Sequence, residues 1–203
     1  MLYFKILTPS TLDLLCGLMH EPLLERTRLV GGTALALQLG HRTSIDLDLF
    51  GQVSCDEMQL QHCLKKFGQV KVMNLSQHVK MFTVNGVKVD IVNYDNPWID
   101  SLVQEDDIRL ASVYEIAAMK VRAIIGRGTR KDFVDLYYLL QLFSMTRIME
   151  LFHLKYPDFN DFMAIRSLLF FDDAEQMPMP MMLDSTPWKT MKDYIKKSVK
   201  EIL

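Results

Sequence analysis

The sequence has few cysteines, and their arrangement excludes a disulfide framework and a zinc site. Cys16, Cys55 and Cys63 are odd in number and lack the paired spacing of metal ligands. The simplest interpretation is that these thiols are reduced, as in a cytosolic protein.

Long apolar runs and a large net charge are absent as well. The apolar run at the start of the chain is too short for a signal peptide, and no later run is long enough to cross a bilayer. The formal net charge of -2 over 203 residues excludes a dominant basic surface, so any nucleic-acid contact must come from a local patch. We therefore expect a soluble cytoplasmic protein with no membrane segment.

The hydrophobic pattern changes near residue 105. Before that point, periodicity predicts helices over 9–19, 33–39 and 56–67, and strands over 29–30, 45–50, 79–84 and 87–92. After it we expect only helices, over 112–125, 132–143, from 147, from 160 and after 187, with Ser112 and Glu115 forming a capping box. The sequence predicts an α+β fold, with a small mixed β-sheet flanked by helices in 1–105 and a helical lobe in 106–203.

Residues 31–50, GGTALALQLGHRTSIDLDLF, place two carboxylates in an otherwise apolar strand. Alternation assigns Ile45, Leu47 and Leu49 to the buried face. Asp46 and Asp48 then share the other face, about 6.5–7 Å apart along the strand. Charged groups are rarely buried without a partner, and two carboxylates at this spacing can lean toward one cation. The plainer alternative is that the strand exposes both acids to solvent.

A third carboxylate comes from the hairpin around Asn85-Gly86. A two-residue turn there places Met81 opposite Asp90, so that Asp90 faces away from the buried side of the hairpin. The buried side consists of Phe82, Val84, Val87, Val89 and Ile91. If this hairpin lies beside the Asp-x-Asp strand, three carboxylates meet on one face, where Mg²⁺ would offset their repulsion.

Gly31 and Gly32 end one strand and lead into a helix. Backbone amides without a Cβ, at the N-terminus of a helix, form a natural seat for phosphate. Carboxylates that hold a metal beside such a seat favour phosphoryl or nucleotidyl transfer.

The stretch GGTALALQLGHRTSIDLDLF resembles the G-G/S…D-x-D signature of the nucleotidyltransferase superfamily, whose fold is shared with DNA polymerase β. More narrowly, it resembles the AbiEii/AbiGii toxin family of bacterial abortive-infection systems. The stretch EIAAMKVRAIIGRGTRKDFVDLYYLL, residues 115–140, is similar to the downstream lysine and KDxxDLY-type motifs of that family. The matching segments span most of residues 28–140.

The resemblance implies an enzyme that uses Mg²⁺, in a two-metal site, to move an NMP from an NTP to an acceptor hydroxyl. The acceptor would be a tRNA 3′ end, a protein or a small molecule. The protein would be the toxin of a toxin–antitoxin or phage-defence pair, with a DNA-binding antitoxin as its cognate partner.

The resemblance also implies roles for individual residues. Asp46, Asp48 and Asp90 would be metal ligands, and Asp90 would also orient or deprotonate the attacking hydroxyl. Lys120 would neutralise triphosphate charge. Asp135, which is favoured over Asp132, would complete the later motif. Lys120 and Asp135 are therefore expected to be catalytic as well. The expected nucleotide-binding residues are Gly31, Gly32, Thr33, Arg42, Ser44, Lys120, Arg130, Lys131 and Asp132.

Several of these residues also have a plainer interpretation. On spacing alone, Lys120 is a solvated lysine, and Asp132 is a charge that complements a helix N-terminus. Arg42 reaches a phosphate or simply pairs with an acid, while Arg130 and Lys131 provide either phosphate contact or surface charge. Two other functions stay open. One is a catalytically inactive nucleotide-binding or protein-interaction module of the same fold; the other is nucleotide-sugar transfer, which leaves Gly31-Gly32 and the KDxxDLY helix unexplained.

Overall fold

The computed structural model describes all 203 residues, and they form two compact units. Unit 1 comprises Met1–Gln38, Ser44–Asn96 and Leu102–Ala111. Unit 2 comprises Leu39–Thr43, Pro97–Ser101 and Ser112–Leu203. Two short segments of the first half of the chain therefore belong to the same unit as the C-terminal helices.

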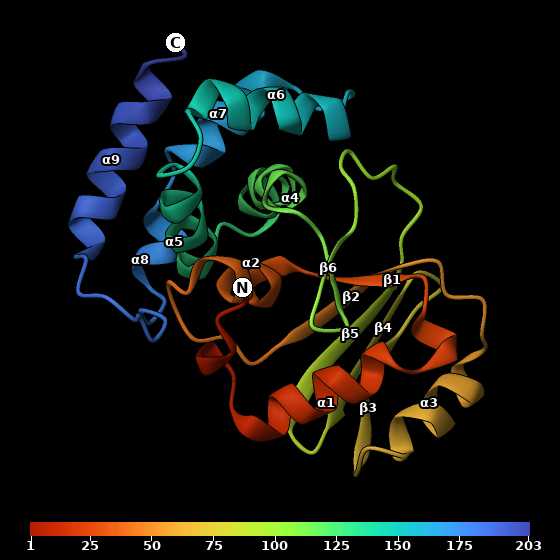
Figure 1. Cartoon of the computed structure of the whole chain (residues 1–203). Coiled ribbons are helices and arrows are strands. Elements are labelled where there is room, and N and C mark those ends of the chain that lie inside the picture. Colours follow the sequence, from red (N-terminus) through yellow and green to blue (C-terminus); the bar gives the residue numbers. More distant parts are fainter. The chain divides into compact units, whose positions relative to one another are not determined.

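Unit 1 contains a seven-stranded mixed sheet with the strand order β3-β4-β5-β2-β1-β7-β6 (Figure 1). Neighbouring strands are antiparallel except for the pairs β2–β5 and β1–β7, which are parallel. The strands are β1 (Thr27–Val30), β2 (Leu47–Gly51), β3 (Val70–Leu75), β4 (Val79–Val84), β5 (Val87–Asn93), β6 (Val103–Glu105) and β7 (Ile108–Leu110). The helices are α1 (Pro9–Met19), α2 (Gly31–Leu39) and α3 (Glu57–Lys65). The α+β class expected from the sequence is confirmed.

The local signals for these helices and for the hairpin act as expected. The Thr8 side chain caps α1, with Pro9 at its first position, and Asp56 opens α3 in a capping box with Gln59. Gly40 ends α2 with a φ of 66°. Asn85 and Gly86 both have positive φ, as the two-residue turn between β4 and β5 requires.

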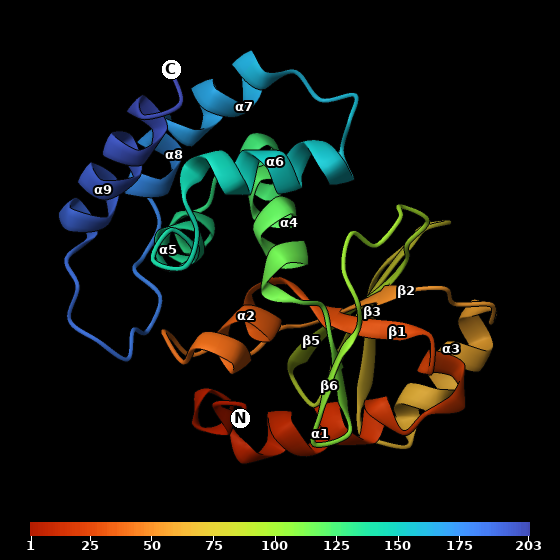
Figure 2. The same ribbon diagram turned by 45° about the horizontal axis from the view of Figure 1, so that its top comes forward.

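The core of unit 1 lies between apolar helix residues and one face of the sheet. Its fully buried side chains include Leu15, Leu18, Leu60, Leu64, Leu47, Leu49, Phe82, Val84 and Val89. Helix α1 lies close to the end of α3 (Figure 2), where a Cβ added to Gly17 would come within 2.4 Å of the Phe67 ring. Ile45 was expected on the buried face, but this expectation is wrong, because Ile45 precedes β2 and is 59% exposed.

The sheet is larger than the sequence indicates. The expectation of helices only after residue 105 is wrong, because β7 follows that point and pairs with both β1 and β6. Each of β6 and β7 has three residues, too few for alternation to be recognised, and they meet at a turn in which Asp106 and Asp107 have positive φ. Strand β3 lies at the sheet edge and is mostly exposed, so it has no apolar face.

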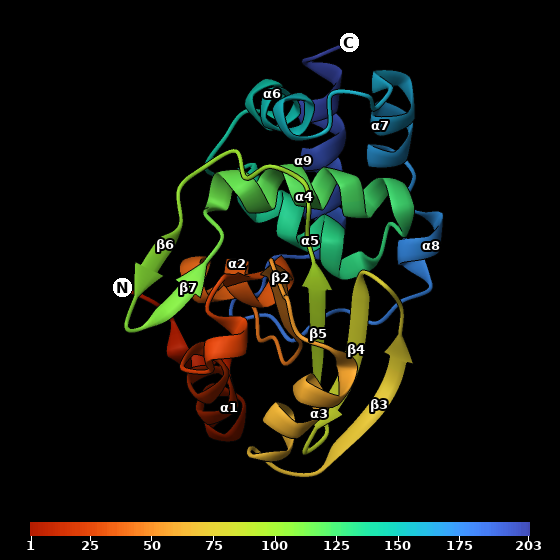
Figure 3. The ribbon, with the colours of Figure 1, turned by 90° about the vertical axis from the view of Figure 1, so that its right-hand side faces the viewer.

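Unit 2 is helical and is built around α4 (Val113–Gly126), which Figure 3 shows along its length. Helices α5 (Arg130–Leu139), α6 (Met145–Lys155) and α7 (Asp161–Leu168) pack on α4. Helices α8 (Asp172–Glu175) and α9 (Trp188–Lys200) pack on α5. No helix of the chain is both long and apolar enough to span a membrane.

The expected capping box at the start of α4 forms only in part. The Ser112 side chain accepts a hydrogen bond from the Glu115 backbone, as predicted. The Glu115 carboxylate does not return to Ser112. It accepts a bond of 2.8 Å from the Ile99 backbone N–H and forms an ion pair with Lys155, and both charged side chains are buried. The acid therefore joins α4 to α6 and to the segment 97–101 of the same unit.

Candidate active site

Asp48 and Asp90 lie side by side on neighbouring strands. Strands β2 and β5 are parallel, and their register pairs Leu47 with Val89 and Asp48 with Asp90. Across the hairpin, Met81 is opposite Asp90, as the two-residue turn predicts. The hairpin thus lies beside the Asp-x-Asp strand, with Asp46 immediately before the first residue of β2. The two chain segments therefore bring their carboxylates to one face of the sheet.

Gly31 brings the N-terminus of α2 against this face. Its φ is +69°, and a Cβ at this position would lie 2.4 Å from Asp48 Oδ2. Only glycine combines this left-handed backbone with so close an approach to a carboxylate. Gly32, the next residue, is not among the positive-φ positions. The first turn of α2 therefore starts directly at the Asp48 side chain.

Thr33 connects this turn to the loop before β2. The Thr33 hydroxyl donates to the Asp46 carbonyl and shares a 2.7 Å hydrogen bond with the Ser44 hydroxyl, which then acts as donor. Thr33 is buried, so these bonds form away from solvent. The structure thus brings together the predicted residues of this region within unit 1: Gly31, Gly32, Thr33, Ser44, Asp46, Asp48 and Asp90.

Replacing Gly31 with alanine is expected to displace the Asp48 carboxylate. The added methyl group needs the space of Asp48 Oδ2, and the left-handed backbone adds roughly 1–2 kcal/mol of strain. We expect Gly31→Ala to lower the free energy of unfolding by about 2 kcal/mol in urea titrations. Gly32→Ala is the matched control, since its φ is not positive, and equal losses in the two variants would contradict this account.

The donor chemistry of the carboxylate face fits a hard divalent cation. One oxygen of Asp90, Oδ1, is buried without a hydrogen-bond partner, and such atoms usually have a ligand. The other oxygen, Oδ2, lies 2.5 Å from Lys88 Nζ. As the side chains lie, no three acidic, histidine or cysteine side chains come close enough to hold a metal ion. A metal cation that binds Asp90 would therefore have to compete with Lys88 for its carboxylate.

Four further predicted residues form a buried charge cluster inside unit 2. Lys120 Nζ lies 3.0 Å from Asp132 Oδ1 and 2.6 Å from Asp135 Oδ2. Arg42 donates two hydrogen bonds to the Asp135 carboxylate, of 2.7 Å from Nε and 2.9 Å from Nη2. The interpretation of Lys120 as a solvated lysine is wrong, since the residue is 3% exposed. Of the two readings of Arg42, the structure shows pairing with an acid.

Three further side chains complete this cluster. His41 Nε2 donates to Asp135 Oδ1 at 2.8 Å, and its ring packs against Tyr138. Arg127 and the Thr129 hydroxyl donate to Asp132. Asp132 does stand in the first turn of α5, but its carboxylate is buried rather than solvated. His41 is not among the residues expected in the site, because its partner lies 94 positions away in the chain.

The cations of the cluster determine the ionisation of its acids. Burial raises the pKa of Asp135, but Lys120 and Arg42 outweigh it and hold that pKa well below the usual range. The pKa of Asp132 is lowered in the same way, with Lys120 and Arg127 outweighing burial. Burial lowers the pKa of Lys120, but Asp135 and Asp132 outweigh it and raise that pKa. All three groups are therefore charged at neutral pH.

Acid is expected to destabilise the protein through this cluster. Because folding lowers the pKa of Asp132 and Asp135, their stabilisation is present above about pH 4 and is lost as the pH falls below that value. The free energy of unfolding, measured in urea at steps from pH 6 to pH 3, should fall most steeply at the acid end. In a variant with Asp132→Asn and Asp135→Asn, the free energy of unfolding should depend less steeply on pH. The same dependence as in wild type would show that these two acids are not the cause of the acid destabilisation.

The remaining predicted cations have other surroundings. Arg130 donates to the carbonyls of Ala174 and Glu175 at 2.8 and 2.9 Å and lies over the Trp188 ring. These bonds join α5 to α8 and α9 within unit 2. Lys131, the next residue, is exposed. The nucleotide-binding roles of both residues remain predictions.

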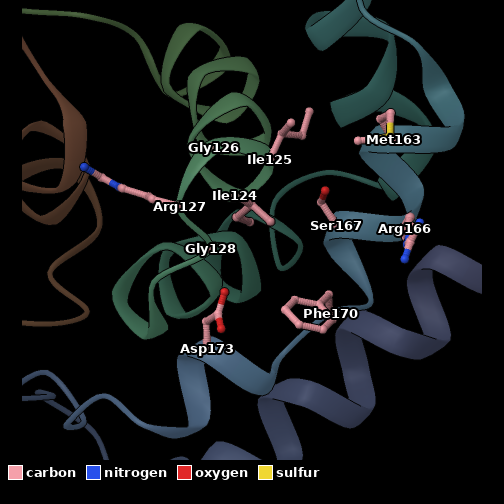
Figure 4. A pocket seen from close by; sticks show the side chains of 10 residues that line it. All are labelled: Ile124, Ile125, Gly126, Arg127, Gly128, Met163, Arg166, Ser167, Phe170 and Asp173. Carbon is pink, nitrogen blue, oxygen red and sulfur yellow. The ribbon is translucent and has the colours of Figure 1, made fainter.

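One cavity of unit 2 contains no predicted site residue. It has a volume of about 360 Å³ and lies between the end of α4 and α7, lined by Ile124, Ser167, Phe170 and Asp173 among others (Figure 4). Arg127 contributes to its rim, but the side chain points away from the cavity (Figure 4). The lining residues of this cavity therefore all belong to unit 2.

The mixed sheet, the paired carboxylates and the glycine turn define a nucleotidyltransferase. Over residues 13–201 the chain matches the nucleotidyl transferase AbiEii toxins of type IV toxin–antitoxin systems. It is 30% identical over 182 residues to the protein aq_aa25 of Aquifex aeolicus, covering 86% of this chain and 87% of the relative. The chain belongs to the AbiEii nucleotidyltransferase toxin family.

Two solved structures share the fold. MenT4, a nucleotidyltransferase toxin from Mycobacterium tuberculosis, superposes with a TM-score of 0.60 at 14% identity, covering 95% of this chain and 84% of MenT4. The antibiotic-resistance factor ANT(2'')-Ia gives a TM-score of 0.57 at 14% identity, covering 75% of this chain and 91% of that protein. At these identities the likeness shows the fold alone.

Proposed function

We propose that this nucleotidyltransferase uses Mg²⁺ and transfers an NMP from an NTP to an acceptor hydroxyl. The observation that carries the proposal is the parallel register that sets Asp48 beside Asp90, with the Gly31 turn against Asp48. Asp48 thus lies against the glycine that opens a helix, and carboxylates near the backbone amides of a helix N-terminus suit a metal-bound triphosphate, which supports the proposal.

Bound to Asp46, Asp48 and Asp90, Mg²⁺ in a two-metal site would stabilise charge on the phosphate oxygens and favour ionisation of the acceptor. The amides at Gly31 and Gly32, with the hydroxyls of Thr33 and Ser44, would orient the triphosphate. The acceptor oxygen bonds to the α-phosphorus while the bond from that phosphorus to the α–β bridging oxygen breaks. The acceptor proton passes to the Asp90 carboxylate, and pyrophosphate leaves.

We propose that Lys120 and Asp135 serve activity by positioning other groups. Both side chains are buried and paired, so Lys120 has no free ammonium to offer a triphosphate in this state. Their pairing holds Arg42 and the backbone of 39–43, which follows α2 directly in the chain. Arg42, Arg130 and Asp132 are paired within the protein as well, so nucleotide contacts by these residues and direct contact by Lys120 are the weaker part of the predicted site. The exposed Lys131 stays a proposed nucleotide contact.

The proposed biological role is that of a toxin in abortive infection, acting in the cytoplasm, with a DNA-binding antitoxin encoded beside it. The description of the family as toxins of type IV toxin–antitoxin systems supports this role. For the acceptor, we place an RNA such as a tRNA 3′ end first, followed by a protein and a small molecule. ANT(2'')-Ia, whose structure is known in complex with adenylyl-2''-tobramycin, shares the fold, and this supports a small molecule as the alternative acceptor.

The test is transfer of label from each NTP in turn to total RNA or to cell lysate, in the presence of Mg²⁺. Label placed on the α-phosphate should enter the acceptor, while label on the γ-phosphate should not, because pyrophosphate leaves. Incorporation of the γ label without the α label would instead indicate a kinase, because a kinase transfers the γ-phosphoryl group and releases the NDP. Tight NTP binding by the folded protein without any incorporation would favour the inactive nucleotide-binding module.

A further inference from the structure

Lys88 is a cation on the carboxylate face that no motif in the sequence assigns. It stands two residues before Asp90 on β5, and its Nζ lies 2.5 Å from Asp90 Oδ2. The Lys88 side chain is 38% exposed, whereas that of Asp90 is 13% exposed. The pair is therefore partly shielded from water, and its attraction exceeds that of an ordinary surface pair.

The neighbouring strand brings further acids to the region of Lys88. The parallel ladder of β2 and β5 begins with Leu47 beside Val89, and Asp46 immediately precedes Leu47 in the chain. One pair further along, Asp48 is beside Asp90. On the opposite strand, β4, Lys88 faces Thr83 and Asp90 faces Met81, neither of which carries a charge. Lys88 is thus bonded to the carboxylate whose register partner is Asp48.

We propose that Lys88 is the resident counter-ion of this site, which holds the Asp90 carboxylate until a divalent cation displaces it. This inference rests on the proposed function, because it assumes that Asp46, Asp48 and Asp90 bind the metal. As the side chains lie, Asp90 is turned to Lys88, and the three acids do not form a ligand group. In this role Lys88 is a positioning residue that lowers metal affinity when no nucleotide is bound.

The test measures Mn²⁺ binding to the nucleotide-free protein by electron paramagnetic resonance. Removal of the competing ammonium in Lys88→Met should lower the Kd for Mn²⁺ by about tenfold. Lys88→Gln is a second variant that retains a polar side chain, and it should act in the same direction. The matched control is Lys71→Met on β3, which lies opposite Thr83 and so shares the face of Lys88 without reaching Asp90.

Thermal melting gives a second readout that does not depend on activity. Without metal, Lys88→Met should melt below wild type, because Asp90 loses its partner, and saturating Mn²⁺ should raise its Tm by more than it raises that of wild type. An unchanged or weaker Mn²⁺ affinity in both Lys88 variants would overturn the inference.

The failure of this inference can be told from failure of the proposed function. If wild type binds Mn²⁺ and Asp90→Asn loses the binding, but the Lys88 variants match wild type, only the counter-ion role is wrong. If neither wild type nor the Lys88 variants bind Mn²⁺, with or without an NTP, both proposals fail. Binding in Lys88→Met alone would support the counter-ion role in its strongest form.

Discussion

Replacing Asp46 and Asp48 together with asparagine is expected to abolish nucleotidyl transfer while the protein stays folded. Asparagine keeps the size of the side chains but removes both charges that the proposed metal requires. The rate of NMP incorporation should fall by about a thousandfold or more. The fold should persist because the core side of β2 consists of Leu47 and Leu49, which are unchanged.

A control with the same chemistry is available in the same unit. Asp106 and Asp107 form the turn between β6 and β7 and have positive φ, which asparagine tolerates well. The double variant Asp106→Asn and Asp107→Asn should retain the wild-type rate. Incorporation at the wild-type rate by the Asp46 and Asp48 variant would remove the basis of the metal-site proposal.

The second large effect is expected at Asp135, where Asp135→Asn should destabilise the protein by about 3–5 kcal/mol. The carboxylate is fully buried. It accepts hydrogen bonds from His41 and Arg42 and forms an ion pair with Lys120. Removal of its negative charge leaves the buried cations Lys120 and Arg42 without most of the negative charge that balances them. Urea unfolding at pH 7 measures the loss, and Asp161→Asn is the control, because its ion pair with His153 is exposed.

The same variant separates two roles for Asp135. A large loss of stability, together with activity that returns in Asp135→Glu in proportion to the folded fraction, would indicate positioning. A protein that is as stable as wild type but inactive would contradict the structural role. It would instead show that Asp135 acts directly at the substrate.

The carboxylate face could be predicted from the sequence because its geometry depends on local rules. The Asn85-Gly86 turn fixes the register of β4 and β5, and this register assigns Asp90 to one face. Alternation in β2 assigns Asp48 in the same way. The pairing of β2 with β5 was the condition that joined the two segments, and the structure satisfies it.

The charge cluster of unit 2 could not be predicted because its contacts join distant parts of the chain. His41 and Arg42 reach Asp135 over 94 and 93 positions, and helical spacing carries no information about such partners. Lys120 looked solvated because its acids lie on the next helix. Strands β6 and β7 were missed because pairing, of β7 with β1 and of β6 with β7, rather than their own pattern, makes them strands.

The central claim is that Asp46, Asp48 and Asp90 hold a divalent cation beside the Gly31 turn. The most direct measurement is an anomalous difference map from crystals grown with Mn²⁺ and a non-hydrolysable NTP. We predict a peak within about 2.0–2.3 Å of oxygens from Asp48 and Asp90, with the triphosphate at the N-terminus of α2. A map with Mn²⁺ at other acids, while Asp90 stays bonded to Lys88 in the NTP complex, would contradict the account.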